Sequence, residues 1–152
     1  MEIDWRMAER IEIRSADSSD LDLVMQDGCI SLEALKEKVA HEEVVVATRD
    51  AERVGYARVE FLWSTVPYIS MIWVLEEHRG LGISRALLWH LESRFRSDGY
   101  TALYSSSDAN EPEPQAWHRH MGFVECGFIA GINAGGVGEI IFRKVLGSDR
   151  DK

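Results

Sequence analysis

Hydrophobic and polar residues alternate along the chain in short segments, some with the period of a strand and others with that of a helix. Residues 11–17 (IEIRSAD) alternate apolar and polar side chains, which is typical of a half-buried strand. Residues 18–28 begin with Ser and Asp and end with Gly, and residues 31–41 repeat Leu and Val at helical spacing. These patterns predict one strand followed by two helices.

The middle of the chain predicts three strands. Residues 43–50 and 53–63 are rich in β-branched and aromatic side chains and flank a short polar turn, so we expect an antiparallel hairpin. Residues 68–75 (YISMIWVL) form a longer apolar run with aromatic and β-branched content, which predicts a central strand.

The last part of the chain alternates helical and strand patterns. Leu87, Leu91 and Phe95 lie four apart and predict a helix over 84–99. A strand, a short helix and two strands are predicted after it, at residues 100–107, 111–122, 123–132 and 138–146. The order β-α-α-β-β-β-α-β-α-β-β combines hairpins with helical crossovers. We therefore predict an α+β fold of mixed α/β character, with parallel and antiparallel pairs in one sheet.

Composition narrows the class of protein. A chain of 152 residues is most simply one domain, spanning residues 1–152. It has no apolar run near the roughly 20 residues of a membrane span, and residues 1–14 are too charged for a secretory signal. Cys29 and Cys126 are too few for a disulfide framework or a metal site, and we expect both to be buried. These features predict a cytoplasmic protein with no metal and no membrane partner.

The formal net charge of −9 argues against nucleic acid as a partner, because phosphate binding requires a basic surface. Long-range attraction would favour a cationic or amine-bearing partner, although acidity also serves solubility alone. Both interpretations stay open.

Residues 79–84 (RGLGIS) carry the clearest chemical signal, because they lie where the predicted central strand ends and a helix begins. A helix start exposes backbone N–H groups that lack internal partners and carry about half a positive charge. Gly80 and Gly82 leave these amides open to a ligand. Arg79 adds a cation suited to phosphate oxygens, and Ser84 can cap the helix or donate a further hydrogen bond.

The turn therefore predicts an anion site, most naturally for a diphosphate. A plain tight turn with a solvated arginine is the alternative. The chain lacks the G-x-x-x-x-G-K-[ST] of a nucleotide-binding P-loop and the G-x-G-x-x-G of a dinucleotide fold.

Residues 72–88 (IWVLEEHRGLGISRALL) resemble the signature segment of the GNAT superfamily of N-acetyltransferases, in which a strand leads into R/Q-x-x-G-x-G/A and a helix. Arg79, Gly82 and Ser84 occupy the three pattern positions, and Ser84 departs from the usual Gly or Ala. Asn110 followed by AWHRHMGF is similar to the family's N…A-x-x-x-Y-x-x-x-G-F segment. The strand order matches as well, so the resemblance covers a core of about 11–146.

The resemblance implies acetyl-CoA as co-substrate and a central sheet with a splay between its fourth and fifth strands, flanked by helices. The backbone of Ile72, Trp73 and Val74 would pair with the pantetheine arm at the splay, and Asn110 would border its thiol end. The pyrophosphate would be held by the amides of the turn, namely Arg79, Gly80, Leu81, Gly82, Ile83 and Ser84. The implied reaction is direct acetyl transfer to a primary amine of a small molecule or peptide.

The resemblance leaves the acid and the base of this reaction open. The family often places a tyrosine four residues before Gly-Phe as the thiol acid, and this chain has His118 there. Histidine has an unperturbed pKa near 6.5 and can protonate a thiolate, while packing beside Trp117 is the alternative. Ser70 replaces a strand carboxylate that some relatives use as base. Glu60 is then the candidate base, with a solvated strand glutamate as the alternative.

Two other functions stay open at this point. Residues 82–86 (GISRA) resemble a G-x-S-x-G nucleophile elbow, which would make Ser84 the nucleophile of a hydrolase served by Asp108 and His118. A non-catalytic CoA-binding module is the second alternative. Residues 131–139 (GINAGGVGE) lie where relatives often border the acceptor site, and a plain hairpin turn is the alternative. The identity of the amine and a homodimeric state are left open.

Overall fold

The computed structural model describes residues 10–147, and its elements follow the predicted order. The strands are β1 (Ile11–Ser15), β2 (Val44–Arg49), β3 (Glu52–Leu62), β4 (Val66–Val74), β5 (Ala102–Asp108), β6 (Val124–Ile129) and β7 (Glu139–Val145). The α-helices are α2 (Leu21–Val24), α3 (Leu32–Ala40), α4 (Ile83–Ser97) and α5 (Pro112–His120). Short 3₁₀ turns are η1 (Ser18–Asp20), η2 (Met25–Asp27), η3 (Glu76–His78) and η4 (Ala134–Gly136).

The predicted first helix is shorter than its sequence pattern suggested. A 3₁₀ turn precedes and another follows the four-residue α2, so residues 18–27 form three short helical pieces. Asp17 caps the first piece by accepting a hydrogen bond from Ser19 N at 2.8 Å. Gly28 ends the last one with φ of 69°, a left-handed conformation that suits glycine.

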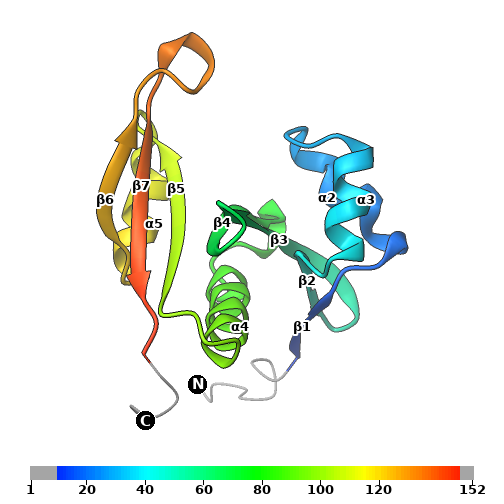
Figure 1. Cartoon of the computed structure of the whole chain (residues 1–152). Helices are drawn as coiled ribbons and strands as arrows, with labels where there is room; N and C mark the ends of the chain where they lie inside the picture. The colour runs from blue at the N-terminus through cyan, green and yellow to red at the C-terminus, as the bar shows by residue number, and fades with distance from the viewer. Residues whose placement is uncertain (1–9, 148–152) are drawn as a thin grey trace, which may run out of the picture. The chain divides into compact units, whose positions relative to one another are not determined.

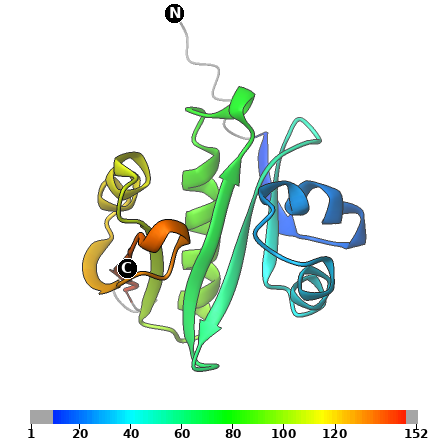
Figure 2. The ribbon, with the colours of Figure 1, turned by 90° about the horizontal axis from the view of Figure 1, so that it is seen from above.

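The seven strands form one mixed sheet in the order β1-β2-β3-β4-β5-β7-β6, as the α+β prediction required. β3 and β4 are its long adjacent strands (Figure 2). β4 and β5 run parallel and pair at Tyr68–Tyr104 and Ile69–Ser105. This pair is short, as expected for the predicted splay between the fourth and fifth strands. β5 pairs with β7, and β7 with β6, in antiparallel register.

The described residues belong to two compact units. The first contains residues up to Val59 together with Met71–His90, and the second contains Glu60–Ser70 together with the residues from Leu91 onward. β4 therefore contributes its first half to the second unit and its second half to the first.

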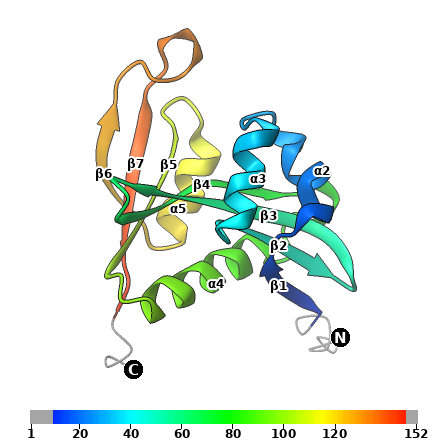
Figure 3. The same cartoon turned by 45° about the vertical axis from the view of Figure 1, so that its right-hand side comes forward.

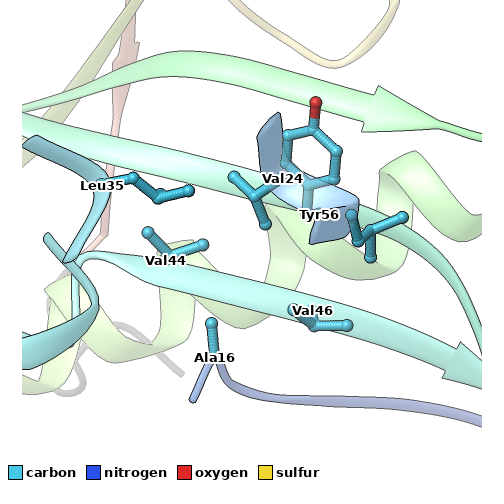
Figure 4. Packing of buried hydrophobic residues seen from close by; sticks show 7 residues of the cluster. Ala16, Val24, Leu35, Val44, Val46 and Tyr56 are labelled. Atoms are coloured by element: carbon cyan, nitrogen blue, oxygen red, sulfur yellow. The ribbon is translucent and has the colours of Figure 1, made fainter. Parts of the chain in front are cut away.

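In the first unit, α2 and α3 cover one face of β2 and β3 (Figure 3). A buried apolar cluster joins them; its labelled members in Figure 4 are Ala16, Val24, Leu35, Val44, Val46 and Tyr56. Leu35 is the buried residue of α3 and faces the valines of β2, as the leucine spacing predicted. Burying each such Leu or Val side chain stabilises the fold by roughly 1.5–3 kcal/mol.

In the second unit, β5, β7 and β6 lie side by side and α5 packs behind them (Figure 1). The prediction that both cysteines are buried is wrong, since Cys29 and Cys126 are exposed. Cys29 follows Gly28 in a surface loop, and Cys126 lies on β6, an edge strand whose residues are all exposed. Within residues 10–147, no helix has both the length and the apolar character that crossing a membrane requires.

Candidate active site

The turn between β4 and α4 presents a row of backbone donors. Gly80 and Gly82 adopt positive φ angles of 77° and 83°, a conformation that glycine reaches without strain. α4 then begins at Ile83, and its first helical bond runs from Ala86 N to Gly82 O at 3.0 Å. The N–H groups of residues 80–83 meet no acceptor among the described residues. They form an exposed donor set at the start of a 15-residue helix, where an anion is favoured.

Arg79 is held next to these donors by the strand that leads into the turn. Its Nε donates to Val74 O at 3.2 Å, and its side chain remains exposed. Ser84 is half-buried in the first turn of α4. The predicted pyrophosphate residues 79–84 are thus contiguous, and the open amides and the cation lie on the same turn.

The end of β4 lies close against β3 because of one glycine. A Cβ built on Gly55 would lie 2.7 Å from Trp73 O, so only glycine fits this approach of the two backbones. The Trp73 ring is nearly parallel to that of Tyr56, with centroids 6.4 Å apart. Ile72, Trp73 and Val74 are half-buried.

Tyr56 in turn belongs to a buried polar group. Asp27 accepts hydrogen bonds from Tyr56 Oη at 2.5 Å and from Arg58 Nη1. The side chains of Asp27 and Arg58 are only 1% and 4% exposed. Burial opposes the charge of Asp27, yet the hydrogen bonds from Arg58 and Tyr56 outweigh it and lower the pKa of this carboxyl.

His118 is 5% exposed and sits in an aromatic enclosure of the second unit. Its ring stacks on Phe142 at 4.6 Å and meets Phe123 edge-on. Nδ1 bonds to Pro114 O and Nε2 to Ser105 Oγ, both at 2.7 Å. Because Pro114 O can only accept, Nδ1 carries the proton and Nε2 accepts from Ser105 in the neutral ring.

Burial lowers the pKa of His118, which further favours the neutral form. These contacts favour the packing alternative, and the role of His118 as thiol acid stays a prediction. They also weigh against a serine hydrolase, because the partners of the His118 nitrogens do not include Asp108.

Glu60 and Asn110 are both exposed. Glu60 lies on β3, and its negative charge contributes to raising the pKa of Tyr68. Asn110 lies in the turn between β5 and α5, beside Ala109, whose N–H donates to Gly138 O. The roles predicted for both residues stay predictions.

Sequence reasoning missed a polar network on the second unit. Tyr68 of β4 hydrogen-bonds Ser106 of β5, and Ser106 Oγ donates to Glu139 Oε2 of β7 at 3.3 Å. These residues are 33 to 71 positions apart in the sequence and become neighbours only through the order of the strands in the sheet. No local sequence pattern predicts this contact. Glu139 closes the glycine-rich segment that the sequence had marked as a border of the acceptor site.

A family model described as the acetyltransferase (GNAT) family matches residues 4–123. This match spans most of the chain and includes the β4–α4 turn. The chain belongs to the GNAT acetyltransferase family. It is therefore an acyltransferase. The role predicted for residues 79–84 stays a prediction. Among curated proteins, none matches the sequence.

Solved structures agree on the GNAT fold. Ard1 from Thermoplasma volcanium superposes with a TM-score of 0.82 at 16% identity, covering 91% of this chain and 99% of that one. A ribosomal-protein-alanine N-acetyltransferase from Brucella melitensis gives 0.75 at 23% identity, covering 89% and 99%. PaiA N-acetyltransferase from Thermoplasma acidophilum, solved with coenzyme A, gives 0.72 at 15% identity, covering 89% and 98%.

Proposed function

We propose that this GNAT protein is an acetyl-CoA-dependent N-acetyltransferase that moves the acetyl group directly to a primary amine of a small molecule or peptide. The observation that carries the proposal is the set of unpaired N–H groups at residues 80–83 beside Arg79. A doubly charged diphosphate suits such a set, because backbone donors, the helix dipole and a guanidinium all favour negative charge.

The pantetheine arm would lie along Ile72, Trp73 and Val74. Gly55 fixes where this backbone runs, because the carbonyl of Trp73 fills the space of a missing Cβ. Val74 O is already engaged by Arg79, which leaves backbone groups of the neighbouring residues to pair with the amides of pantetheine. A backbone N–H near Val74 would serve as donor to the thioester oxygen as it becomes an oxyanion.

The chemistry requires an amine free of its proton, a polarised thioester carbonyl and a leaving thiolate that becomes protonated. Holding carrier and amine in a reactive geometry supplies much of the acceleration by itself. Solved structures with a similar fold include ribosomal-protein-alanine N-acetyltransferases and a nourseothricin acetyltransferase. Both a peptide N-terminus and nourseothricin therefore belong in the first acceptor screen, and the net charge of −9 favours cationic acceptors of either kind.

Calorimetry with acetyl-CoA tests the carrier site through two matched glycines. Gly82 and Gly99 flank α4, both have positive φ, and neither has an atom within 4 Å of a built Cβ. Gly82→Ala and Gly99→Ala should therefore lose similar stability, about 1 kcal/mol. Only Gly82→Ala should weaken acetyl-CoA binding, by about tenfold or more, because its methyl group and backbone strain disturb the donor row.

S-acetylpantetheine completes this test because it lacks the diphosphate. S-acetylpantetheine should bind more weakly than acetyl-CoA, and its affinity should be the same for both variants. Equal acetyl-CoA affinity for Gly82→Ala and Gly99→Ala would show that the β4–α4 turn does not bind acetyl-CoA. A thiol-release assay with pooled amines, including an alanine-terminated peptide and a polyamine, then tests transfer: a wild-type protein that binds acetyl-CoA and transfers to none of them would contradict the proposed activity.

A further inference from the structure

Three polar side chains form a continuous hydrogen-bonded row across three neighbouring strands of the second unit. Tyr68 stands on β4, Ser106 on β5 and Glu139 on β7. The Tyr68 hydroxyl bonds to Ser106 Oγ, and Ser106 Oγ donates to Glu139 Oε2 at 3.3 Å. The sheet order β4-β5-β7 makes these strands neighbours, so the row follows directly from the topology.

Strand register places the row on one face of the sheet. Tyr68 pairs with Tyr104, and Asp108 lies opposite Glu139. Because side chains alternate along a strand, Tyr104, Ser106 and Asp108 share a face and Ser105 points to the other. Ser105 bonds His118 of α5, so the row lies on the face of β5 away from α5.

The donors and acceptors of the row have a defined direction. An ionised Glu139 can only accept, so the Ser106 proton points to it. The oxygen of Ser106 is then left to accept from Tyr68, whose hydroxyl proton points to Ser106. The free lone pairs of Tyr68 Oη are thus available to accept a proton from outside the row.

The far end of the row is suited to receive a proton. Glu139 Oε1 is buried and has no hydrogen-bond partner among the described residues. Burial, and next the Asp108 carboxyl opposite it, raise the pKa of Glu139. Burial also raises the pKa of Tyr68, with the charges of Glu139 and Glu60 adding to the effect, so its hydroxyl keeps its proton and acts as a relay.

We propose that Tyr68, Ser106 and Glu139 conduct the proton of the acceptor ammonium to the Glu139 carboxylate. The inference rests on the proposed function and names its proton acceptor. The ammonium N–H bond breaks as Tyr68 Oη takes the proton, Tyr68 passes its own proton to Ser106, and Ser106 passes its proton to Glu139. The neutral amine attacks the thioester carbonyl, and its second proton leaves with the coenzyme A thiol. Tyr68 is the catalytic residue of this path, while Ser106 and Glu139 act through it.

The path accounts for features of this chain that the family pattern leaves unexplained. Ser70 stands where some relatives carry a strand carboxylate, and His118 is enclosed with both nitrogens bonded. Glu60 is exposed, whereas Glu139 has a buried oxygen without a donor, which a proton would satisfy. The row therefore offers a carboxylate to the reaction through two hydroxyl groups.

The pH dependence of kcat for an amine that the wild type acetylates tests the path. Ser106→Ala interrupts the row between two intact ends, and Ser106→Thr keeps the hydroxyl as its matched control. Ser106→Ala and Glu139→Gln should each lower kcat about 100-fold at neutral pH. Together they should lower it little further, because both break one path. Ser106→Thr should stay within a few-fold of wild type.

The acid limb of the kcat profile separates a proton path from a structural role. Glu139→Gln should abolish the limb, whereas Asp108→Asn should move it to lower pH, because a neighbouring negative charge is removed. Acetyl-CoA affinity by calorimetry should be unchanged in every variant. An active wild type with an unchanged kcat profile in Ser106→Ala and Glu139→Gln would overturn this inference alone. A wild type that acetylates no amine would overturn the proposed function and this inference with it.

Discussion

The pKa values of three partly or fully buried side chains, Asp27, His118 and Glu139, shift according to their surroundings. Asp27 accepts from Tyr56, Arg58 and the Cys29 N–H, and its pKa is lowered. His118 meets one carbonyl and one hydroxyl, and burial lowers its pKa. Glu139 lies opposite Asp108, and burial together with that carboxyl raises its pKa. Of these three side chains, only Glu139 has a buried oxygen without a hydrogen-bond partner among the described residues. The first two sites gain stability from their hydrogen bonds, whereas the third gives up stability in exchange for a group that can take a proton.

This difference predicts how Glu139→Gln changes stability with pH. The pKa of Glu139 is higher in the folded protein than in the unfolded chain. Near pH 4, close to the ordinary glutamate pKa of about 4.3, the protonated form carries little penalty. As pH rises through the folded value the penalty is fully expressed. We expect Glu139→Gln to raise Tm relative to wild type at pH 8, and clearly less at pH 4, in thermal melts. A larger gain at pH 4 would contradict the assignment.

Replacing Asp27 should lower the stability of the fold, in contrast to the gain expected for Glu139→Gln. Asp27→Asn removes the carboxylate that pairs with the buried Arg58 guanidinium, and we expect a loss of about 3–5 kcal/mol in the free energy of unfolding by urea titration. The exposed pair of Arg119 and Glu125, with side chains 50% and 52% exposed, is the control. Glu125→Gln should cost less than about 1 kcal/mol. Because the pKa of Asp27 is lowered, its contribution is present above the ordinary aspartate pKa and is lost as pH falls through the folded value.

His118 gives a prediction that separates its two interpretations. If the ring serves packing, His118→Phe should lower stability by about 1–3 kcal/mol, because the Ser105 hydroxyl keeps only its longer contact to Ile69 O at 3.5 Å and Pro114 O loses its donor. The pH profile of kcat should then keep its alkaline limb. Loss of that limb, in a variant that is folded by circular dichroism and binds acetyl-CoA normally, would instead support the thiol-acid role.

At the scale of the elements, the β3–β4 contact fixes the backbone that we propose for pantetheine. Gly55→Ala would place a methyl group 2.7 Å from Trp73 O, so β4 must shift. We expect acetyl-CoA affinity to fall by about tenfold or more in calorimetry. Gly127→Ala on β6 is the matched control, since its Cβ would lie at an ordinary 3.7 Å from Ile141 of β7. Equal affinities for the two variants would show that the position of Trp73 does not matter for binding.

The sequence predicted elements well where one local period decides the structure. The leucine spacing of α4, the apolar run of β4 and the glycines of the turn each act through neighbouring residues. The turn at residues 79–84 could be predicted for the same reason, because the helix start and the two glycines occur within six consecutive residues. The pattern over 18–28 predicted one helix, yet its capping residues divide it into three short pieces.

Features that depend on pairing between strands distant in sequence could not be predicted from the sequence. The sequence marked residues 131–139 only as a glycine-rich segment near the acceptor site, and the surroundings of Glu139 arise because β7 lies next to β5 and places Asp108 opposite it. Cysteine is a residue type that is usually buried, but Cys126 lies on the edge strand β6, where it is exposed. His118 occupies the family's acid position, but its enclosure by Phe123, just before β6, and by Phe142 of β7 depends on tertiary packing that the sequence pattern does not give.

At the scale of the whole chain, a formal net charge of −9 opposes the approach of an anionic carrier. Binding of acetyl-CoA must therefore rest on the local donors of residues 79–84, while the overall charge favours a cationic acceptor. The two substrates should respond oppositely to salt, because screening weakens a long-range repulsion for one and a long-range attraction for the other.

Acetyl-CoA binding should also stabilise the whole fold, since a ligand that binds only the native state adds RT ln(1 + [L]/Kd) to the free energy of unfolding. At a ligand concentration 100 times Kd this amounts to about 2.7 kcal/mol, which for a chain of this length raises Tm by roughly 5–10 °C. Differential scanning fluorimetry against acetyl-CoA and S-acetylpantetheine at equal concentration measures the part that belongs to the nucleotide end. We expect the shift with acetyl-CoA to be the larger in wild type, and to shrink in Gly82→Ala but not in Gly99→Ala. A wild-type shift that is equal for both ligands would show that the β4–α4 turn does not bind the diphosphate.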